Sequence, residues 1–485
     1  MPAFPFIGAA YEARSVNFDA QRCVNLYPEP SGSGTSKSVA ALIGTPGMRL
    51  YSNSTAYGKA ARGLYKFTDT VSIRVVGGVV SKNTLPATEV VIGAIVERDT
   101  PVAMADNGTT VMLVTGYGEG YFIDPVAGTV TQITSPDFVG ATGVGFVAGR
   151  FVWNKLGTGQ FQYTEPYDTA INPLNFYTAE SSPDALLNLV VNHSEVWLFG
   201  SDSVETWVLS GDNTDPFVRI QGAQMETGID AARSLAKMDN TLFWLGGDSR
   251  GRGIVLKAAG YSQAARVSTH AIEYAIGKYG DTSDAIAFTY QQEGHTFYVL
   301  SFPTASKTWV YDASTNLWHE RAHLTASGEF QRIRACCQMA WDNKVLVGDY
   351  VSGGMYEYDL DYQFEPGSPD FVPRSIPRIR VAPHLSNDLK NQLFHSLQID
   401  MQTGVGVIFP LEGRDPQAML SWSDDGGHTW SSEAWAPIGK IGETRTRVRW
   451  RRLGKSRDRV FKLVITDPVK VVLIGATAEV TPCPT

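Results

Sequence analysis

The sequence predicts an all-β chain: a β-propeller of six or seven blades, an extended arm before it and an antiparallel β-domain after it. Three observations predict this fold. The chain has 47 Gly, 20 Tyr and 11 Trp but few helical runs. Short apolar strands recur at similar spacing, and a proline-rich run follows the last of them. We therefore expect an arm over residues 1–58, a propeller over 59–375 and a C-terminal domain over 376–485.

The first 58 residues lack the repeating strands of the next region. One short apolar run, Cys23–Pro28, reads as a strand. The stretch Pro28–Ser36 that follows is rich in glycine and serine, which is typical of a flexible loop. Gly44–Met48 then turns into a second strand. These features predict an extended N-terminal arm.

Seven apolar strands of similar character mark the repeat region. Their centres are Ile73, Met112, Phe151, Trp197, Phe243, Tyr298 and Leu346, at separations of 39, 39, 46, 46, 55 and 48 residues. A period of this length is typical of propeller blades, because each small sheet needs neighbours to bury both of its faces. One unit can belong to a neighbouring module, so six and seven blades are equally admissible. A pair of β-sandwiches is the alternative, and the regular spacing argues against it.

The end of the repeats is marked by proline. Pro366, Pro369, Pro373, Pro377 and Pro383 fall within one short stretch and indicate a domain boundary. Beyond it, the alternating run Phe394–Met401 predicts a strand of a compact β-domain. Helix is scarce throughout, and Ser268–Ile276 is the best short helical segment.

The C-terminal domain contains one Asp box, the pattern S-x-D-x-G-x-T-W. Its residues are Ser423, Asp425, Gly427, Thr429 and Trp430. The carboxylate can accept hydrogen bonds from nearby backbone N–H groups, the glycines supply positive φ, and the tryptophan ring packs beside the turn. Asp boxes occur in sialidases but also in proteins without catalysis. We interpret this one as a structural hairpin, with a sugar site as the alternative.

A strongly basic segment follows the Asp box. Residues 440–470 contain 11 Lys and Arg against 3 Asp and Glu, a net charge of +8 in a chain whose total is −8, so the remaining residues sum to −16. The segment 446–467 reads as two strands joined by a turn at Gly454–Ser456. By the two-residue period, Arg447, Arg449 and Arg451 share one face, and Arg452 lies on the other face with Val448 and Trp450.

This basic segment has three interpretations. It can be the charged face of an edge strand that resists aggregation, a protein interface, or a contact to nucleic-acid phosphates. The acidic remainder of the chain argues against general affinity for DNA. Our candidate interface comprises Arg447, Arg449, Arg451, Arg452, Lys455, Arg457 and Arg459.

The search for catalytic motifs yields little. The chain has no G-x-x-x-x-G-K-[ST] phosphate loop, no H-E-x-x-H zinc motif and no G-x-S-x-G nucleophile elbow. His319 and His323 have a spacing that suits a metal only on a helix, and they follow a turn between predicted strands. Paired carboxylates for sugar cleavage are not testable from sequence. We predict no enzyme activity, no catalytic residues, no cofactor and no metal, with a carbohydrate-binding propeller or sialidase-like hydrolase as the alternative.

The remaining features bear on the compartment. We find no signal peptide at the N-terminus and no apolar stretch of membrane-spanning length, so we expect no membrane anchor. The four cysteines form neither a disulfide framework nor a zinc spacing. These observations predict a soluble protein made in a reducing compartment.

Four patches of the sequence resemble one known family, the packaged-DNA stabilisation or tail hub (nozzle) proteins of short-tailed bacteriophages. They occur in family order and span nearly the whole chain. The patches are Val24–Pro28 with Thr45–Met48, Met225–Ile229, Gly260–Tyr274 and Trp450–Asp467. The last of these is the most specific.

The resemblance implies a non-enzymatic structural protein of the virion tail, assembled in the host cytoplasm. It implies a ring, expected to be a hexamer, below the portal and its adaptor ring. That ring would extend the DNA channel, retain packaged DNA and carry the tail needle, tailspike or other distal parts. DNA would pass through the lumen without sequence-specific binding, since an acidic wall repels it. The basic strand would then face a protein neighbour.

Overall fold

The computed structural model describes residues 3–32, 35–86, 88–179, 182–212, 214–248, 251–367, 372–409 and 411–483. Their regular structure is almost entirely strand, which confirms the prediction of an all-β chain. The single α-helix among these residues, α1 (His270–Ile276), lies within the predicted helical segment. Thr269 caps it, because its hydroxyl accepts a hydrogen bond from the backbone N–H of Ile272. No helix in the described ranges is long and apolar enough to cross a membrane.

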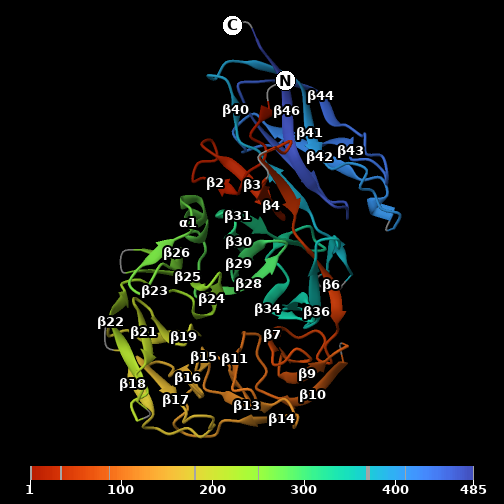
Figure 1. Ribbon diagram of the computed structural model, residues 1–485. Coiled ribbons are helices and arrows are strands. Elements are labelled where there is room, and N and C mark those ends of the chain that lie inside the picture. The colour runs from red at the N-terminus through yellow and green to blue at the C-terminus, as the bar shows by residue number, and fades with distance from the viewer. Residues whose placement is uncertain are drawn as a thin grey trace.

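Between residues 47 and 359 the described strands form seven units of four or five strands, one of them part of a larger sheet, and Figure 1 shows them arranged as a wheel. The first four are β7 (Ala61–Lys66), β8 (Val71–Val76), β9 (Val79–Thr84) and β10 (Thr88–Ala94); β11 (Ala103–Asp106), β12 (Val111–Val114), β13 (Gly120–Asp124) and β14 (Thr129–Gln132); β15 (Val144–Val147), β16 (Arg150–Asn154), β17 (Gln160–Tyr163) and β18 (Phe176–Thr178); β19 (Leu186–Asn192), β20 (Glu195–Gly200), β21 (Val204–Leu209) and β22 (Phe217–Met225).

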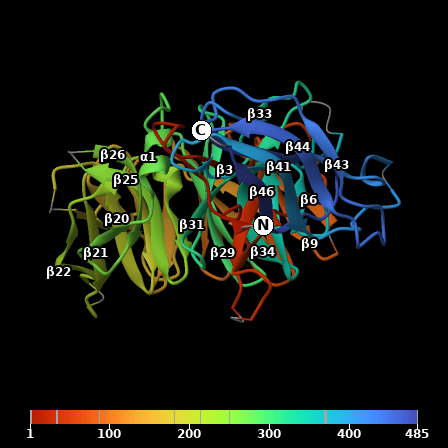
Figure 2. The same cartoon turned by 90° about the horizontal axis from the view of Figure 1, so that it is seen from above.

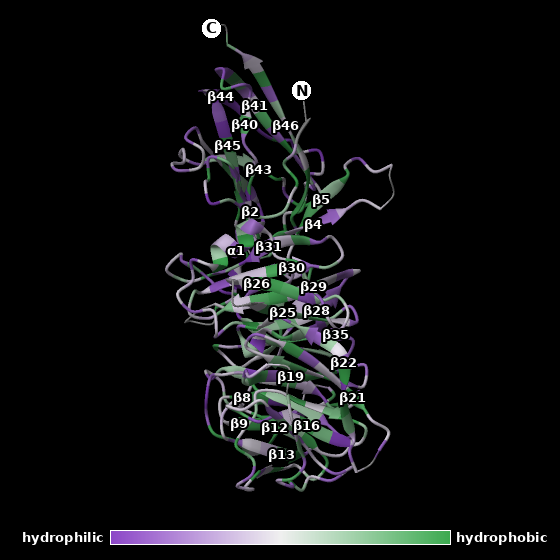
Figure 3. Ribbon diagram, turned by 90° about the vertical axis from the view of Figure 1, so that its left-hand side faces the viewer, coloured by the Kyte–Doolittle hydropathy of each residue, from purple (hydrophilic) through white to green (hydrophobic). Residues whose placement is uncertain are grey.

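The other three sheets complete the wheel. They are β23 (Gly228–Ile229), β24 (Ala236–Met238), β25 (Thr241–Asp248), β26 (Gly251–Ala258) and β27 (Ala264–Arg266); β28 (Ile286–Gln292), β29 (His295–Phe302), β30 (Lys307–Asp312) and β31 (Leu317–Arg321); β34 (Ala335–Trp341), β35 (Lys344–Asp349), β36 (Met355–Asp359) and β6 (Gly47–Ser52). Figure 3 shows the wheel from its side, with strongly hydrophobic segments in strands such as β25 and β28. A short extra ribbon, β32 (His323–Leu324) with β33 (Phe330–Gln331), follows β31.

Short polar turns set the register of several sheets. His193–Ser194, Asp239–Asn240, Glu293–Gly294 and Asp342–Asn343 have positive φ at both residues. Such turns have a twist that matches the twist of the paired strands, so they favour tight hairpins. They connect β19 to β20, β24 to β25, β28 to β29 and β34 to β35. Each of these turns therefore joins the two strands of a tight hairpin.

Six of the sheets line one common cavity with their first strand, and the fifth sheet does so through the segment between β23 and β24. A cavity of about 330 Å³ is lined by residues of β7, β11, β15, β19 and β28, by the β34 cysteines, and by Arg233 from the 3-10 helix η1 (Ala232–Ser234) that precedes β24. All seven sheets thus contribute to one space. That arrangement is the one that a propeller produces when its blades pack around an axis.

The N-terminal segment supplies the last strand of the wheel. β6 pairs antiparallel with β36, so the final sheet joins residues near 50 to residues near 356. Gly47 begins this strand where only glycine fits, because an added Cβ would lie 2.1 Å from the carbonyl oxygen of Tyr362. The wheel therefore cannot be completed without residues from both ends of the repeat region.

The C-terminal domain is a sandwich of two layers. One layer contains β4 (Leu26–Pro30), β5 (Ala40–Gly44), β46 (Val472–Pro482), β41 (Gln392–Met401) and β44 (Val448–Ser456), with β1 (Ala3–Phe4) paired to β46. The other contains β3 (Ala20–Val24), β39 (Arg378–Val381), β45 (Asp458–Ile465), β42 (Gln417–Ser423) and β43 (Ala434–Pro437), with β2 (Tyr11–Glu12) and β40 (Leu385–Ser386) at its margins. Leu397, Leu420, Leu463 and Leu473 are fully buried between the layers.

The predicted extended arm is not confirmed. Residues 3–44 instead contribute β1 to β5 to the sandwich, and β6 belongs to the wheel. The prolines predicted to mark a boundary surround a short ribbon, β37 (Phe364–Glu365) with β38 (Arg374–Ser375). Pro369 lies outside the described residues.

One sheet passes without a break from the wheel into the sandwich. β31, the outer strand of the sixth sheet, pairs in parallel with β3, which pairs in turn with β39. The sandwich is therefore attached at the rim of the wheel, as Figures 1 and 2 show.

Asn25 holds this junction together. Its side-chain amide donates to the carbonyl oxygens of Ala322 and Pro377, at 2.8 Å each, and accepts from the Ala322 N–H at 3.0 Å. The residue is fully buried and has a φ of 55°, which asparagine tolerates better than most residues. One side chain thus connects an N-terminal strand, the wheel and the start of the C-terminal segment.

We expect Asn25→Ala to lower the free energy of unfolding by roughly 3–5 kcal/mol, because it leaves three buried backbone groups without partners. Urea denaturation followed by tryptophan fluorescence measures the change. Asn391→Ala, at an exposed position of the same domain, is the control and should cost less than about 0.5 kcal/mol. Equal effects of the two substitutions would contradict the role assigned to Asn25.

Candidate interface on the C-terminal domain

The basic segment spans two layers of the sandwich. β44 pairs with β41 in one sheet, whereas β45 pairs with β39 and β42 in the other. The two strands do not pair with each other, and only Arg457 separates them. The predicted hairpin with a turn at Gly454–Ser456 is therefore wrong: those residues continue β44, and the chain crosses between layers after them.

The alternation within β44 follows the prediction up to Arg451. Val448 and Trp450 are buried, while Arg447 and Arg451 are exposed and Arg449 is half-buried on the opposite face. Arg452 differs, because its φ of 60° forms a bulge opposite His395, where the register with β41 shifts. Its side chain is exposed, and Leu453 takes the buried position. The prediction that Arg452 shares the face of Trp450 is wrong.

Five of the predicted residues form an exposed basic ridge, which we define as Arg447, Arg451, Arg452, Lys455 and Arg457. Their side chains make no hydrogen bond or ion pair with any other described residue. β44 is the last strand of its sheet, so this ridge lies along an unpaired edge. Positive side chains at such an edge disfavour pairing of the edge strand with a strand of another sheet, and they can form ion pairs with carboxylates of a partner.

Arg449 is already paired within the domain. Its guanidinium donates to Glu479 at 3.0 Å and to the hydroxyl of Ser396 at 2.8 Å. It supports the β41–β44–β46 layer and contributes less free charge to the surface than its neighbours do.

Arg459 is not on the surface. It is 1% exposed, donates to both carboxylate oxygens of Asp424 at 2.7 and 2.9 Å, and donates to the carbonyl oxygen of Leu453 at 2.6 Å. Its guanidinium also lies over the ring of Phe394, 4.5 Å from the centroid. It connects the two layers of the sandwich, so the inclusion of Arg459 in the candidate interface is corrected.

The Asp box forms a closed network around one carboxylate. Asp425 accepts hydrogen bonds from the backbone N–H groups of His428 and Thr429, from the Thr429 hydroxyl at 2.6 Å and from the Ser423 hydroxyl at 2.6 Å. Gly426 and Gly427 have φ of 77° and 104°. The hydroxyl of Ser423, then that of Thr429, hold the pKa of Asp425 well below its usual range. All the hydrogen-bonding capacity of this carboxylate is used within the turn.

Trp430 packs against the sheet that follows the turn. Its ring lies beside Val464, and the ammonium of Lys462 is 4.4 Å from its centroid. The geometry stabilises a hairpin and leaves the Asp425 carboxylate no free oxygen for a ligand.

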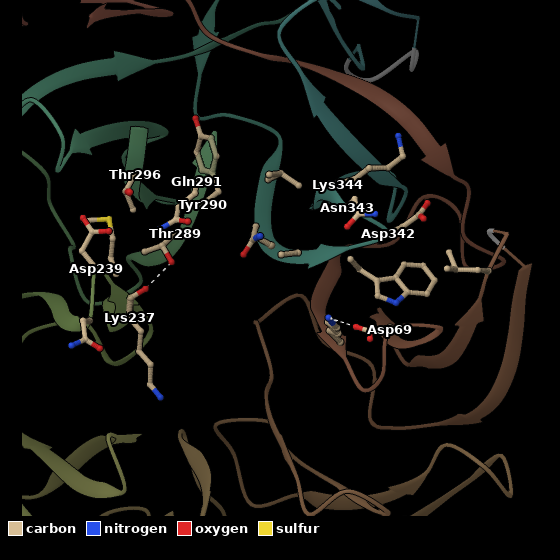
Figure 4. A pocket seen from close by; sticks show the side chains of 18 residues that line it. Asp69, Lys237, Asp239, Thr289, Tyr290, Gln291, Thr296, Asp342, Asn343 and Lys344 are labelled. Carbon is tan, nitrogen blue, oxygen red and sulfur yellow. Dashed lines mark hydrogen bonds and ion pairs between the residues drawn. The ribbon is translucent and has the colours of Figure 1, made fainter. Parts of the chain in front are cut away.

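A larger opening lies on the wheel, at the ends of its inner hairpins. Figure 4 shows this cavity of about 960 Å³, with Lys237 and Asp239 on one side and Asp342 and Lys344 on the other. Lys66 pairs with Asp69 at 2.7 Å, and Lys344 pairs with Glu357 at 2.7 Å. Burial lowers the pKa of Lys237, whose ammonium donates to the carbonyl oxygen of Val191. Both signs of charge line the opening, unlike the deep acidic pocket expected of the hydrolase alternative.

The two histidines once considered for a metal lie on different strands. His319 is buried in β31, where burial lowers its pKa to about 3 and keeps the imidazole neutral. His323 is buried in β32 beside Glu365, at 3.3 Å. Among the described residues, no three His, Cys, Asp or Glu side chains are grouped as a metal site would require.

Comparisons with known proteins agree with this architecture. Residues 3–363 match a family described as "Bacteriophage P22 Gp10, beta-propeller", and residues 377–481 match a family described as "Bacteriophage P22 Gp10, beta-sandwich". A curated relative, the tail hub protein gp10 of Salmonella phage P22, is 22% identical over 339 residues, which is 67% of each chain. The crystal structure of the computationally designed protein Ika8 overlaps 64% of this chain and 99% of its own, with 11% identity and a TM-score of 0.40.

We expect Asp425→Ala to loosen the hairpin, because four hydrogen bonds converge on this carboxylate. Hydrogen exchange of the His428 and Thr429 amides should become faster. In the wild type, the protection should be complete above the unfolded pKa of about 3.9 and be lost as the pH falls toward the lowered pKa of the folded carboxyl. Glu433→Gln, exposed beside the hairpin, is the control. Unchanged exchange in Asp425→Ala would show that the network does not hold the turn.

Proposed function

Because this chain belongs to the bacteriophage P22 Gp10 β-propeller family, we propose that it is the structural hub of a short phage tail. The observation that supports this most strongly is the order of the two matches, a propeller followed by a sandwich, over nearly all of the chain. The relative in Salmonella phage P22 carries the name tail hub protein. A hub builds the tail and performs no catalysis, in keeping with the absence of catalytic motifs in the sequence.

The propeller has seven blades in this proposal. Each of the seven sheets contributes to the axial cavity, and the last is completed by β6. The domains proposed from sequence, 1–58, 59–375 and 376–485, are then adjusted. We assign residues 47–359 to the propeller and residues 3–44 together with 376–485 to the sandwich.

The hub acts as a ring of identical subunits, expected to be a hexamer, below the portal and its adaptor ring. The ring extends the DNA channel, retains packaged DNA and carries the needle, tailspike or other distal parts in the virion tail. Assembly takes place in the host cytoplasm. Outside residues 440–470 the chain sums to −16, and a wall of this sign repels DNA and lets it slide.

The basic ridge then serves a protein neighbour. Its five cations have no partners within the described residues, and guanidinium groups pair well with carboxylates. We place the adaptor ring or a sister subunit against this edge of the sandwich. The glycan-binding alternative has no comparable support, since the Asp425 carboxylate is fully used within its own turn.

Electron microscopy of the purified chain, alone and mixed with its portal–adaptor complex, tests the hub directly. We expect rings in at least the mixed sample, coaxial with the portal, and six subunits in each. A protein that binds no portal–adaptor complex and forms no ring would contradict the proposed function. A fluorogenic sialoside assay is the companion measurement and should show no turnover.

The ridge is tested by reversing its charge. We expect Arg451→Glu with Arg452→Glu to weaken docking to the portal–adaptor complex or to sister subunits roughly tenfold or more, because carboxylate partners would then be repelled. Analytical ultracentrifugation of the mixtures measures it. The doubly substituted chain should keep its melting temperature, since both side chains are exposed.

Arg14→Glu with Lys278→Glu, which reverses two exposed cations outside the ridge that make no ion pair with a described residue, is the matched control for that experiment. Equal docking of the ridge variant and wild type would remove the ridge from the interface. Tight, salt-dependent binding of duplex DNA through Arg447 and Arg451 would instead favour a nucleic-acid contact.

A further inference from the structure

A loop of the sandwich exposes four large apolar side chains at one place. Ile408, Phe409 and Leu411 are 79%, 85% and 74% exposed, and Ile441 of the adjacent loop is 63% exposed. We call these four residues the knob. Such groups of exposed apolar side chains mark interaction sites in soluble proteins. In Figures 1 and 2 the loop after β41 projects beyond β43, away from the rest of the domain.

The knob has a rigid base. The N–H of Val407 donates to the carbonyl oxygen of Gly413 at 2.8 Å and closes the loop. Gly406 N–H donates to Gly439 at 3.3 Å, and Gly442 N–H donates to Gly404 at 3.2 Å, so the two loops are joined along their length.

The same chain carries an apolar groove on a different face. The groove has a volume of about 500 Å³ and lies over the sheet that continues from the wheel into the sandwich. It is lined by Ile379 and Val381 of β39, by Val464 of β45, and by the aromatic side chains of Trp430 and Phe330. By the two-residue period, Phe461, Leu463 and Ile465 of β45 face the sandwich core, so the groove is the second face of this sheet.

One charged side chain in the groove makes no direct ion pair, although the Glu433 carboxylate is close enough to act on it through its charge. Lys462 is half-buried there, and its ammonium lies over the Trp430 ring without an ion pair to any described residue. Burial lowers its pKa. The knob carries the complementary group: Glu412 directly follows Leu411, is exposed, and likewise has no ion pair within the described part of the chain. The two surfaces are therefore both largely apolar, and each carries one charge opposite in sign to that of the other.

The knob cannot reach the groove of its own chain as the domain stands. It projects beyond β43, whereas β2 and β3, which border the groove, lie on the other side of the sandwich in Figure 1. The complementary surfaces can meet only between two copies of the chain. A contact between two different surfaces of identical subunits is head-to-tail, and such contacts close into rings when the rotation permits.

We propose that the knob of one subunit inserts into the groove of the next subunit, with Glu412 of the first pairing with Lys462 of the second. This inference rests on the proposed function, because it names the subunit contact of the hub ring. Burying Phe409 and Leu411 supplies the apolar contact, and the ion pair sets the register of insertion.

A charge swap in the full-length chain tests the contact. We expect Glu412→Lys and Lys462→Glu each to weaken self-association roughly tenfold or more, and the double variant to recover most of that loss. Phe409→Ser should weaken it without recovery. Sedimentation velocity over a concentration series measures the association, and near-ultraviolet circular dichroism checks that each chain is folded.

Two substitutions on the same domain are matched controls. Glu29→Lys reverses an exposed charge, and Val39→Ser removes an exposed apolar side chain that is 88% accessible. Both should assemble as the wild type does. Where the wild-type chain assembles only on the portal–adaptor complex, the same variants are compared by their occupancy of that complex.

The outcomes separate the inference from the function on which it rests. Rings that form equally well in Glu412→Lys, Lys462→Glu and Phe409→Ser would overturn the knob-and-groove contact and leave the hub intact. Single variants that weaken assembly without recovery in the double variant would overturn the direct ion pair. A wild-type chain that forms no ring under either condition would overturn both.

Discussion

The junction around Asn25 is the constraint on which the two domains depend. It is one position where an N-terminal strand, the wheel and the C-terminal segment all exchange hydrogen bonds. Two buried arginines extend the junction: Arg378 donates to the carbonyl oxygens of Thr45 and Ile376, and Arg380 donates to those of Phe6 and Ala9. Burial lowers the pKa of Arg378 to about 10. Burying a guanidinium group or an amide costs free energy unless its hydrogen bonds are made inside the protein. These side chains are therefore stable only in the arrangement that supplies those hydrogen bonds.

A shared sheet has mechanical consequences for an assembly. β31 and β3 form part of one continuous sheet, so the sandwich cannot rotate on a flexible linker relative to the wheel. Surfaces on the two domains are therefore held at a fixed angle. In a ring, a fixed angle within each subunit is what allows identical contacts to close, whereas a hinged subunit would permit chains of variable curvature. The junction thus connects the fold of one chain to the geometry of the proposed hub.

The sequence predicted what local patterns determine. The repeat spacing indicated the propeller strands, and the Asp box indicated its hairpin, because strand patterns and side-chain hydrogen bonds within a turn act over a few residues. It failed where pairing is non-local. Nothing near β44 and β45 reveals that they belong to different layers, and the bulge at Arg452 depends on the register with β41. The basic composition of the segment likewise could not separate Arg459, buried against Asp424, from its exposed neighbours. The knob residues carried no motif, and only their exposure in the folded chain identifies them.

The arginines show why formal charge is a poor guide to this surface. Arg62, Arg74, Arg321, Arg334, Arg378, Arg380 and Arg459 are among the largest fully buried side chains. Arg334 pairs with both oxygens of Asp349, and Arg62 donates to three backbone carbonyls, so these charges stabilise interior contacts rather than the outer field. Among the described residues eight arginines and five carboxylates are buried, so leaving both groups out of the count makes the exposed surface slightly more acidic than the sequence total suggests. The basic ridge on β44 therefore differs in charge from the rest of the surface. A protein neighbour that presents carboxylates to this edge is attracted to it. A polyanion such as DNA is instead repelled by the acidic surface around it.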